Sequence, residues 1–170
     1  TQQKALARIS KTPGRTQQIN VFPISADRAL IDLPGYGYAK VSAGTREEWE
    51  RLLPRYFSKR RALKGVVVIM DIRHPLTPHD RAMLELTKAS DLPVHVLLSK
   101  ADKLKRGAAM NALQAVRREL RKLHPAASVQ LFSAVTRQGV DEVHAQLDRW
   151  LFPAEEAGQT PDPEPDQSVS

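Results

Sequence analysis

The sequence contains no cysteine, only 5% aromatic residues and no long apolar run. Without cysteine the chain can form neither a disulfide nor a thiolate metal site, and this absence fits a cytosolic protein. No apolar stretch approaches the roughly 18 residues of a membrane-spanning helix, so we expect no membrane span. The aromatic residues are too few for a surface on which nucleic-acid bases stack. No Gly-x-Ser-x-Gly elbow occurs, which argues against a serine hydrolase.

Charge is unevenly distributed along the 170 residues. Residues 153–170 hold five acids and no lysine or arginine, and they are rich in proline and serine. We therefore predict that this acidic tail is disordered. Residues 1–152 carry 26 basic against 14 acidic side chains, a net charge of +12. This excess favours a polyanionic partner, above all RNA, although solvated helix surfaces account for it about as well.

Five apolar runs predict strands. Those at 18–22 and 29–32 are joined by a short polar connection and predict a hairpin. The runs at 65–71, 94–99 and 128–133 are the other three, and the first two of these are continuous and rich in β-branched residues or leucine. Such runs suit strands that are covered on both faces of a parallel sheet. Because helical patterns alternate with the strands, we predict an α/β domain over residues 1–152, with a mainly parallel sheet and helices on both faces.

The sequence marks the start of one helix clearly. Thr77 suits the cap position, Pro78 the first turn, and Asp80 the acid of a capping box. The helix is expected to extend to about Ser90. Its core-facing residues are predicted to be Met83, Leu84 and Leu86 or Thr87.

Three other segments have helical periodicity. These are 45–62, where Pro54 predicts a kink or break, and the ranges 107–123 and 139–151. The apolar positions expected to face the core in the last two are Met110, Leu113, Val116 or Ala112, Leu120 and Leu123, then Val140, Val143, Leu147 and Leu151.

Polar residues follow the predicted strands at the edge where parallel sheets collect ligands. Residues 32–35 (DLPG) follow the second strand, 99–102 (SKAD) the fourth, and 133–134 (SA) the fifth. A plain reading is open for each: Pro-Gly suits a type II turn, SKAD can cap a helix, and Asp71 can form a turn. In this order, with the basic stretch 11–16 upstream, they resemble the guanine-nucleotide motifs of a GTPase domain.

The first of these motifs suits a phosphate and its metal. Asp32 at a strand end can hold Mg²⁺, usually through water. Gly35 lets a backbone N–H approach the γ-phosphate because it has no Cβ. The hydroxyl of Thr16, in a mobile loop, would complete the magnesium shell only while that phosphate is present, which makes the loop a switch.

The later motifs suit a guanine base. The carboxylate of Asp102 would accept two hydrogen bonds from N1–H and the 2-amino group, a pair of donors that adenine lacks. The stem of Lys100 would cover the purine face, and the backbone N–H of Ala134 would meet the guanine carbonyl oxygen. An adenine-nucleotide enzyme would need something other than Asp102 at the base.

The chain resembles the EngB (YihA/YsxC) family of small bacterial GTPases over roughly residues 4–151, in the stretches SKTPGRTQQINVF, DLPGYGYAKV, MDIRHPLTPHD, LLSKADKL and FSAVTRQGVDEV. The resemblance implies a P-loop GTPase fold, GTP or GDP as ligand, Mg²⁺ as cofactor, and a role in large ribosomal subunit assembly and in cell division and septation. We expect a cytoplasmic monomer with the large ribosomal subunit or its RNA as partner. Carried over by motif, Thr16 binds magnesium directly and Asp32 through water. The nucleotide-binding residues are then Gly14, Arg15, Thr16, Gln17, Gln18, Asp32, Leu33, Pro34, Gly35, Ser99, Lys100, Ala101, Asp102, Phe132, Ser133 and Ala134.

Two departures from the family pattern matter. Ser99 stands where most GTPases carry asparagine and this family usually has threonine, which is a mild change. The larger departure is the absence of a G-x-x-x-x-G-K-[ST] loop, whose backbone N–H groups, lysine and hydroxyl bind phosphates and magnesium. We expect this loop upstream of Thr1, together with a first strand and a first helix, and so interpret the chain as N-terminally truncated.

That first strand would lie between the strands that end in Asp32 and Asp71. Without it two apolar edges would be left unpaired. We therefore expect the 170-residue chain alone to fold poorly and to bind GTP weakly or not at all.

Hydrolysis is expected to be slow and to depend on a partner, on the switch loops or on a bound cation, because Tyr36 follows Gly35 where Ras-like proteins place a water-orienting glutamine. No catalytic base is identified. The rival reading is a non-enzymatic basic module that binds RNA or the ribosome without nucleotide, through the clusters 59–64, 100–106 and 117–122. The presence of all the motif residues argues against it, since such a module has no use for Thr16, Asp32, Gly35, Lys100 and Asp102 together.

Overall fold

A computed structural model of the chain describes residues 20–33, 53–57 and 62–153. The elements in order are β1 (Asn20–Pro23), β2 (Ala29–Asp32), β3 (Val66–Asp71), α2 (Pro78–Ala89), β4 (Val94–Ser99), η1 (Ala101–Lys103), α3 (Arg106–Leu123), β5 (Ser128–Leu131) and α4 (Val140–Leu151). Residues 53–57 are also helical. The acidic tail beyond Pro153 and most of the predicted helix at 45–62 lie outside the described residues.

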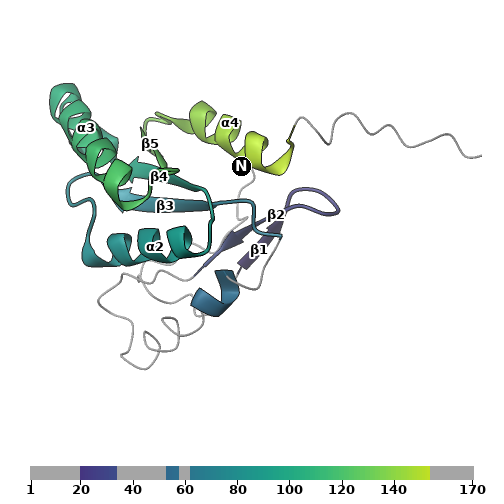
Figure 1. The fold of residues 1–170 in the computed structure, drawn as a ribbon. Helices are drawn as coiled ribbons and strands as arrows, with labels where there is room; N and C mark the ends of the chain where they lie inside the picture. The colour runs from purple at the N-terminus through teal and green to yellow at the C-terminus, as the bar shows by residue number, and fades with distance from the viewer. Residues whose placement is uncertain (1–19, 34–52, 58–61, 154–170) are drawn as a thin grey trace, which may run out of the picture.

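Three parallel strands form the main sheet, in the order β3-β4-β5 (Figure 1). Val66 of β3 is in register with Val94 of β4, and Asp71 with Ser99, so both strands end at one edge. Leu98 is paired with Leu131 of β5. The parallel sheet and the alternation of strands with helices confirm the predicted α/β class. Figure 1 shows α2 on one side of this sheet and α4 on the other.

The predicted hairpin is present as the antiparallel pair β1-β2, with Asn20 opposite Asp32. In the described residues no strand pairing joins β2 to β3, so the hairpin and the main sheet are separate ladders. The guanidinium of Arg28, just before β2, lies 4.6 Å from the ring centroid of Phe152, just after α4. Helix α4 starts from the edge at which β3, β4 and β5 end, so Phe152 lies at the opposite edge. Strand β2 therefore begins at that opposite edge, and Asp32 stands at the other end of β2 (Figure 1).

The start of α2 follows its predicted sequence signal. The Thr77 side chain accepts a hydrogen bond from the backbone N–H of Asp80, and the Asp80 carboxylate accepts one from the backbone N–H of Thr77 at 2.8 Å. Pro78 occupies the first turn, where its missing N–H costs nothing. Met83, Leu84 and Thr87 are buried, and the Thr87 hydroxyl is satisfied by the carbonyl oxygen of Met83 at 2.9 Å.

The structure corrects part of the predicted core of α3. Leu113, Val116 and Leu120 are buried as expected, but Met110 is 41% exposed and Ala109 is buried in its place. Ala109 precedes Leu113 by four residues and so lies on the same helix face, where a small side chain lets the helix approach the sheet closely. Met110 is rotated away from that face by one residue.

Two further boundaries and burials differ from the prediction. β5 ends at Leu131, two residues before the predicted end, because the N–H of Ser133 donates to Gln138 in the following loop instead of to β4. On α4 the predicted inward residues are only half-buried, and the helix has no fully buried residue. The ring of Trp150 lies against Gly65, where a Cβ would stand 2.7 Å from the ring.

The core lies between β3-β4 and the helices α2 and α3. All of β4 except Ser99 is buried, and Val68 and Met70 of β3 face the same core. Leu53 and Phe57 of the short helical segment are buried as well. No helix in the described ranges is long and apolar enough to cross a membrane.

Candidate guanine-nucleotide site

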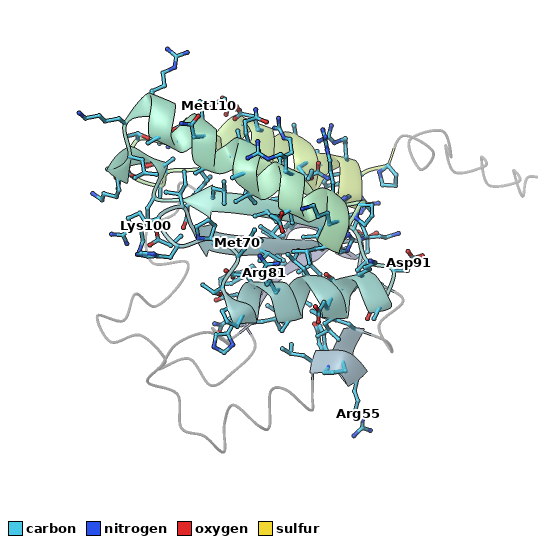
Figure 2. The ribbon with its side chains drawn as sticks, turned by 60° about the vertical axis from the view of Figure 1, so that its left-hand side comes forward. Arg55, Met70, Arg81, Asp91, Lys100 and Met110 are labelled. Atoms are coloured by element: carbon cyan, nitrogen blue, oxygen red, sulfur yellow. The ribbon has the colours of Figure 1, made fainter. Side chains whose placement is uncertain are left out.

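The candidate site lies at the edge where the three parallel strands end. Asp71 and Ser99 are register partners there, and Phe132 continues the ladder by donating its N–H to the carbonyl oxygen of Leu98 at 2.9 Å. Figure 2 places Lys100 at this edge and Asp91 at the opposite edge. Two of the predicted motif segments, 99–102 and 132–134, therefore meet beside Asp71 because the strands are parallel and in register.

The segment 99–102 leaves β4 through an unusual backbone. Lys100 has φ 60° and ψ 34°, a left-handed conformation that costs a non-glycine residue about 1 kcal/mol or more. The reversal brings the N–H of Ala101 to the carbonyl oxygen of Phe132 at 3.1 Å and starts the 3-10 helix that carries Asp102. The hydroxyl of Ser99 donates to the carbonyl oxygen of Met70 at 2.9 Å, so it fastens this turn to β3.

Asp102 and Ser133 are in direct contact. The Ser133 hydroxyl donates to one carboxylate oxygen of Asp102 at 2.6 Å, and Ser133 is fully buried. The other carboxylate oxygen lies 3.2 Å from the ammonium of Lys103. The Ser133 hydrogen bond, helped by Lys103, holds the pKa of Asp102 below its usual value, so the carboxylate is ionised at neutral pH. An ionised carboxylate with free lone pairs is suited to a base that presents two N–H donors.

The loop after β5 is fixed by its own hydrogen bonds. The N–H of Ser133 donates to the carbonyl oxygen of Gln138 at 3.0 Å, and the N–H of Thr136 donates to the Ser133 hydroxyl at 3.2 Å. Gly139 closes the loop with φ 80°. A Cβ at Gly139 would overlap the carbonyl oxygen of Leu131. Ala134 is exposed beside the buried Ser133.

A charged cluster at the same edge was missed by the sequence reasoning, which treated Asp71 as a turn former. Arg73 donates to Asp71 from its backbone N–H at 3.0 Å and from its guanidinium at 2.9 and 2.6 Å. The ammonium of Lys100 also lies 3.0 Å from Asp71. The Arg73 hydrogen bonds, and then Lys100, hold the pKa of Asp71 far below its usual value. The only sequence signal was an aspartate and an arginine two residues apart at a strand end.

The predicted phosphate and metal residues are described only in part. Asp32 is exposed at the end of β2, and its nearest recorded partner is the Asn20 side-chain amide at 3.5 Å. Leu33 packs against the core. The other predicted phosphate-side residues lie outside the described residues: Gly14, Arg15, Thr16, Gln17, Gln18, Pro34 and Gly35.

The described part of the site fits Mg²⁺ in a limited way. Magnesium usually takes one or two carboxylates, with waters and substrate phosphates completing its shell. The lightly engaged carboxylate of Asp32 suits that role. No group of three or more acidic, histidine or cysteine side chains that could hold a metal occurs among the residues described. A single carboxylate is therefore the contribution this part of the chain offers.

Comparison with known proteins matches the chain to one family, one relative and two solved structures. Residues 1–100 match the family described as 50S ribosome-binding GTPases. The chain is 52% identical over 151 residues to the "Probable GTP-binding protein EngB" of Hydrogenovibrio crunogenus, and the match covers 89% of this chain and 71% of that protein.

Two solved structures share the fold. The crystal structure of a probable GTP-binding protein engB has a TM-score of 0.62 at 15% identity, covering 78% of this chain and 82% of that one. Era in complex with MgGDPNP and nucleotides 1506–1542 of 16S ribosomal RNA has a TM-score of 0.61 at 23% identity, covering 92% of this chain and 50% of that one.

Proposed function

The chain belongs to the EngB family of GTP-binding proteins, and we propose that it acts in the cytoplasm as a monomeric GTPase switch in large ribosomal subunit assembly and in cell division and septation. Its fold is that of the P-loop GTPases. The observation that supports the proposal most directly is the contact between Asp102 and Ser133, which gathers two base-recognition motifs at the ligand edge of the sheet.

Guanine recognition would proceed from this contact. The Asp102 carboxylate accepts from N1–H and the 2-amino group of the base, and the fixed Ser133 hydroxyl keeps the carboxylate ionised and oriented. The backbone N–H of Ala134 meets the guanine carbonyl oxygen, and the stem of Lys100 covers the purine face. Adenine presents an acceptor and no 2-amino group to the carboxylate, so it would leave a charged oxygen unpaired.

The phosphate side would be served by residues 14–18 and 32–35. Asp32 and Thr16 are the proposed residues for Mg²⁺, which would neutralise phosphate charge when bound. We propose slow intrinsic hydrolysis, because the tyrosine at position 36 cannot orient water as a glutamine does. A physiological partner would then supply the acceleration.

A ribosomal RNA partner is supported by the charge of α3. This helix carries five basic residues and one acid, and Glu119 is already paired with Lys122 at 2.9 Å. Arg117 and Arg121 are exposed, lie one turn apart on the same face and have no ion pair within the described part of the chain. Era, a protein of the same fold, is known in complex with ribosomal RNA. The α3 surface would therefore contact phosphates.

The test of this partner is RNA retention on a filter at increasing salt. The double variant Arg117→Gln/Arg121→Gln should bind ribosomal RNA less tightly and reduce the slope of log K against log salt by about 1 to 2. Arg149→Gln on α4 is the matched control. An unchanged slope in the α3 variant would rule out this surface.

The test of nucleotide function is titration with a fluorescent GDP analogue and Mg²⁺. Asp102→Asn should weaken GDP binding by more than about 100-fold, since two charge-assisted hydrogen bonds are lost. The same variant should bind the xanthine nucleotide better, because the new amide can donate to the carbonyl oxygen at position 2. This gain would also show that the variant is folded.

The titration should be run on the 170-residue chain and on a version extended upstream by about 40 residues of coding sequence, enough for a strand, a loop and a helix. Removal of Mg²⁺, or Asp32→Asn, should weaken binding of the triphosphate more than that of the diphosphate. If neither version binds GDP, the RNA-binding module without nucleotide becomes the better account.

A further inference from the structure

Asp71 and Arg73, at the end of β3, take no part in the nucleotide contacts proposed above, yet they form an ion-pair cluster with Lys100, which does. Asp71 accepts three hydrogen bonds from Arg73 and is the register partner of Ser99, the residue before Lys100. The Lys100 ammonium donates to the second carboxylate oxygen of Asp71 at 3.0 Å. Arg73 therefore fixes the Asp71 carboxylate, and the same carboxylate binds the Lys100 ammonium.

The geometry points to a positioning residue: we propose that Asp71 orders the Lys100 side chain so that its aliphatic stem is ready to cover the guanine base. The inference rests on the proposed guanine-binding function. A lysine side chain has four rotatable bonds and loses much conformational entropy when it is immobilised. Its partner removes part of that cost before the nucleotide arrives.

Three features of the structure support this role. The backbone of Lys100 is already fixed in the left-handed region, so the ion pair restrains the side chain alone. Arg73 forms a bidentate pair with Asp71, which fixes the carboxylate in one orientation. The Asp71 side chain is only 25% exposed and Lys100 is 55% exposed, so the pair lies at the rim of the site.

The experiment is a double-mutant cycle in whichever of the two versions above binds GDP, with Kd for fluorescent GDP as the readout. Asp71→Asn keeps the size of the side chain and removes its charge, and Lys100→Met keeps much of the apolar stem and removes the ammonium. Asp71→Asn should weaken GDP binding about tenfold, the cost of ordering one long side chain. In the Lys100→Met background the same change should have no further effect.

Asp91→Asn is the matched control. Asp91 lies at the opposite edge of the sheet, so loss of its charge should leave GDP binding unchanged (Figure 2). The urea midpoint of each variant separates lost affinity from lost folding.

Each outcome decides the proposal. An equal loss of affinity with and without Lys100 would mean that Asp71 only stabilises the loop, and tighter GDP binding by Asp71→Asn would mean that it withholds the lysine from the base. Either result would overturn the inference. If the unmodified chain binds no GDP in any length tested, the proposed function fails first, whereas normal wild-type binding with an unaffected Asp71→Asn variant refutes the positioning role alone.

Discussion

The ligand edge of β4 and β5 and the hairpin β1-β2 are built in opposite ways. At the ligand edge β4 is buried, and the segments that follow β4 and β5 are hydrogen bonded to each other. These bonds join Ala101 to Phe132 and Ser133 to Asp102. The hairpin strands alternate between half-buried and exposed residues, and Val21 is 60% exposed. Among the described residues, its terminal carboxylate, Asp32, has a single long contact, to Asn20 at 3.5 Å.

This difference indicates that the two parts of the proposed site have different functions. The base-binding side is preorganised, so little order is left to impose when a guanine base arrives. A switch, in contrast, needs its phosphate-side residues to be fixed only by the phosphate and its metal. The exposed end of β2 suits that requirement, and changes at the two places should therefore affect different properties.

The largest expected effect is on the loop that carries Ser133. Gly139→Ala places a Cβ against the Leu131 carbonyl oxygen and forces an alanine to φ 80°, so we expect a loss of about 3 kcal/mol in unfolding free energy. Urea unfolding measures it. Gly107→Ala is the matched control, because nothing lies within 4 Å of its Cβ and alanine favours the helix. Equal stability of the two variants would contradict this account of the loop.

A smaller change sharpens the contrast by separating affinity from metal dependence. Ser133→Ala removes the hydroxyl that orients Asp102 and leaves the Thr136 N–H without its acceptor. GDP affinity should fall about tenfold and stability by about 1 kcal/mol, while the effect of Mg²⁺ on binding should not change. Ser90→Ala, which removes a hydrogen bond to Leu86 at the far end of α2, is the control for stability. A changed magnesium effect would mean that the two sides are coupled.

The smallest expected effect is a pH dependence of the unfolding free energy, caused by His95 in β4. His95 is buried, with Nδ1 2.7 Å from the Ser128 hydroxyl and Nε2 2.8 Å from the side-chain oxygen Oε1 of Gln130. Since the Gln130 amide donates to the carbonyl oxygen of Gly139, its oxygen faces His95, so the neutral ring carries its proton on Nε2. Burial, with a smaller contribution from Arg149, lowers the pKa of His95 below 6.5.

The sign of this effect follows from linkage. The unfolded chain binds the His95 proton near pH 6.5, and the folded chain binds it only at lower pH. The contribution of the neutral His95 to the unfolding free energy is therefore fully present above pH 6.5 and is lost as the pH falls to the folded pKa. Between these values the slope is at most about 1.4 kcal/mol per pH unit. Urea midpoints at pH 7.5 and 5.5 should differ less for His95→Gln than for the unmodified chain, and identical differences would exclude His95 as the source.

Much of the fold could be predicted from the sequence because its signals are local. The apolar runs of β3 and β4 and the capping box of α2 each act within a few residues, and all three lie where expected. The burial of Ala109 in place of Met110 depends on how closely α3 approaches the sheet, which periodicity alone does not define. The end of β5 depends on the hydrogen bond from the Ser133 N–H to Gln138 in the following loop, which the apolar run does not encode.

The site shows the same limit. The residue types at 99–102 and 132–134 mark their chemistry, but the contact between Asp102 and Ser133 requires two strand registers to be known. The link from Asp71 to Lys100 spans two strands and a left-handed residue, and no short pattern encodes it. Interactions between the ends of different strands are therefore where the structure adds most to the sequence.

The contact between Arg28 and Phe152 has a consequence for the order of folding. It joins the first described turn to the residue after the last helix, so it closes a loop from residue 28 to residue 152. Contacts this distant along the chain repay their closure entropy late. On a translating ribosome the hairpin emerges before α4, so this contact can form only after residue 152 has been synthesised, and we expect it to be among the last contacts of the described residues to form.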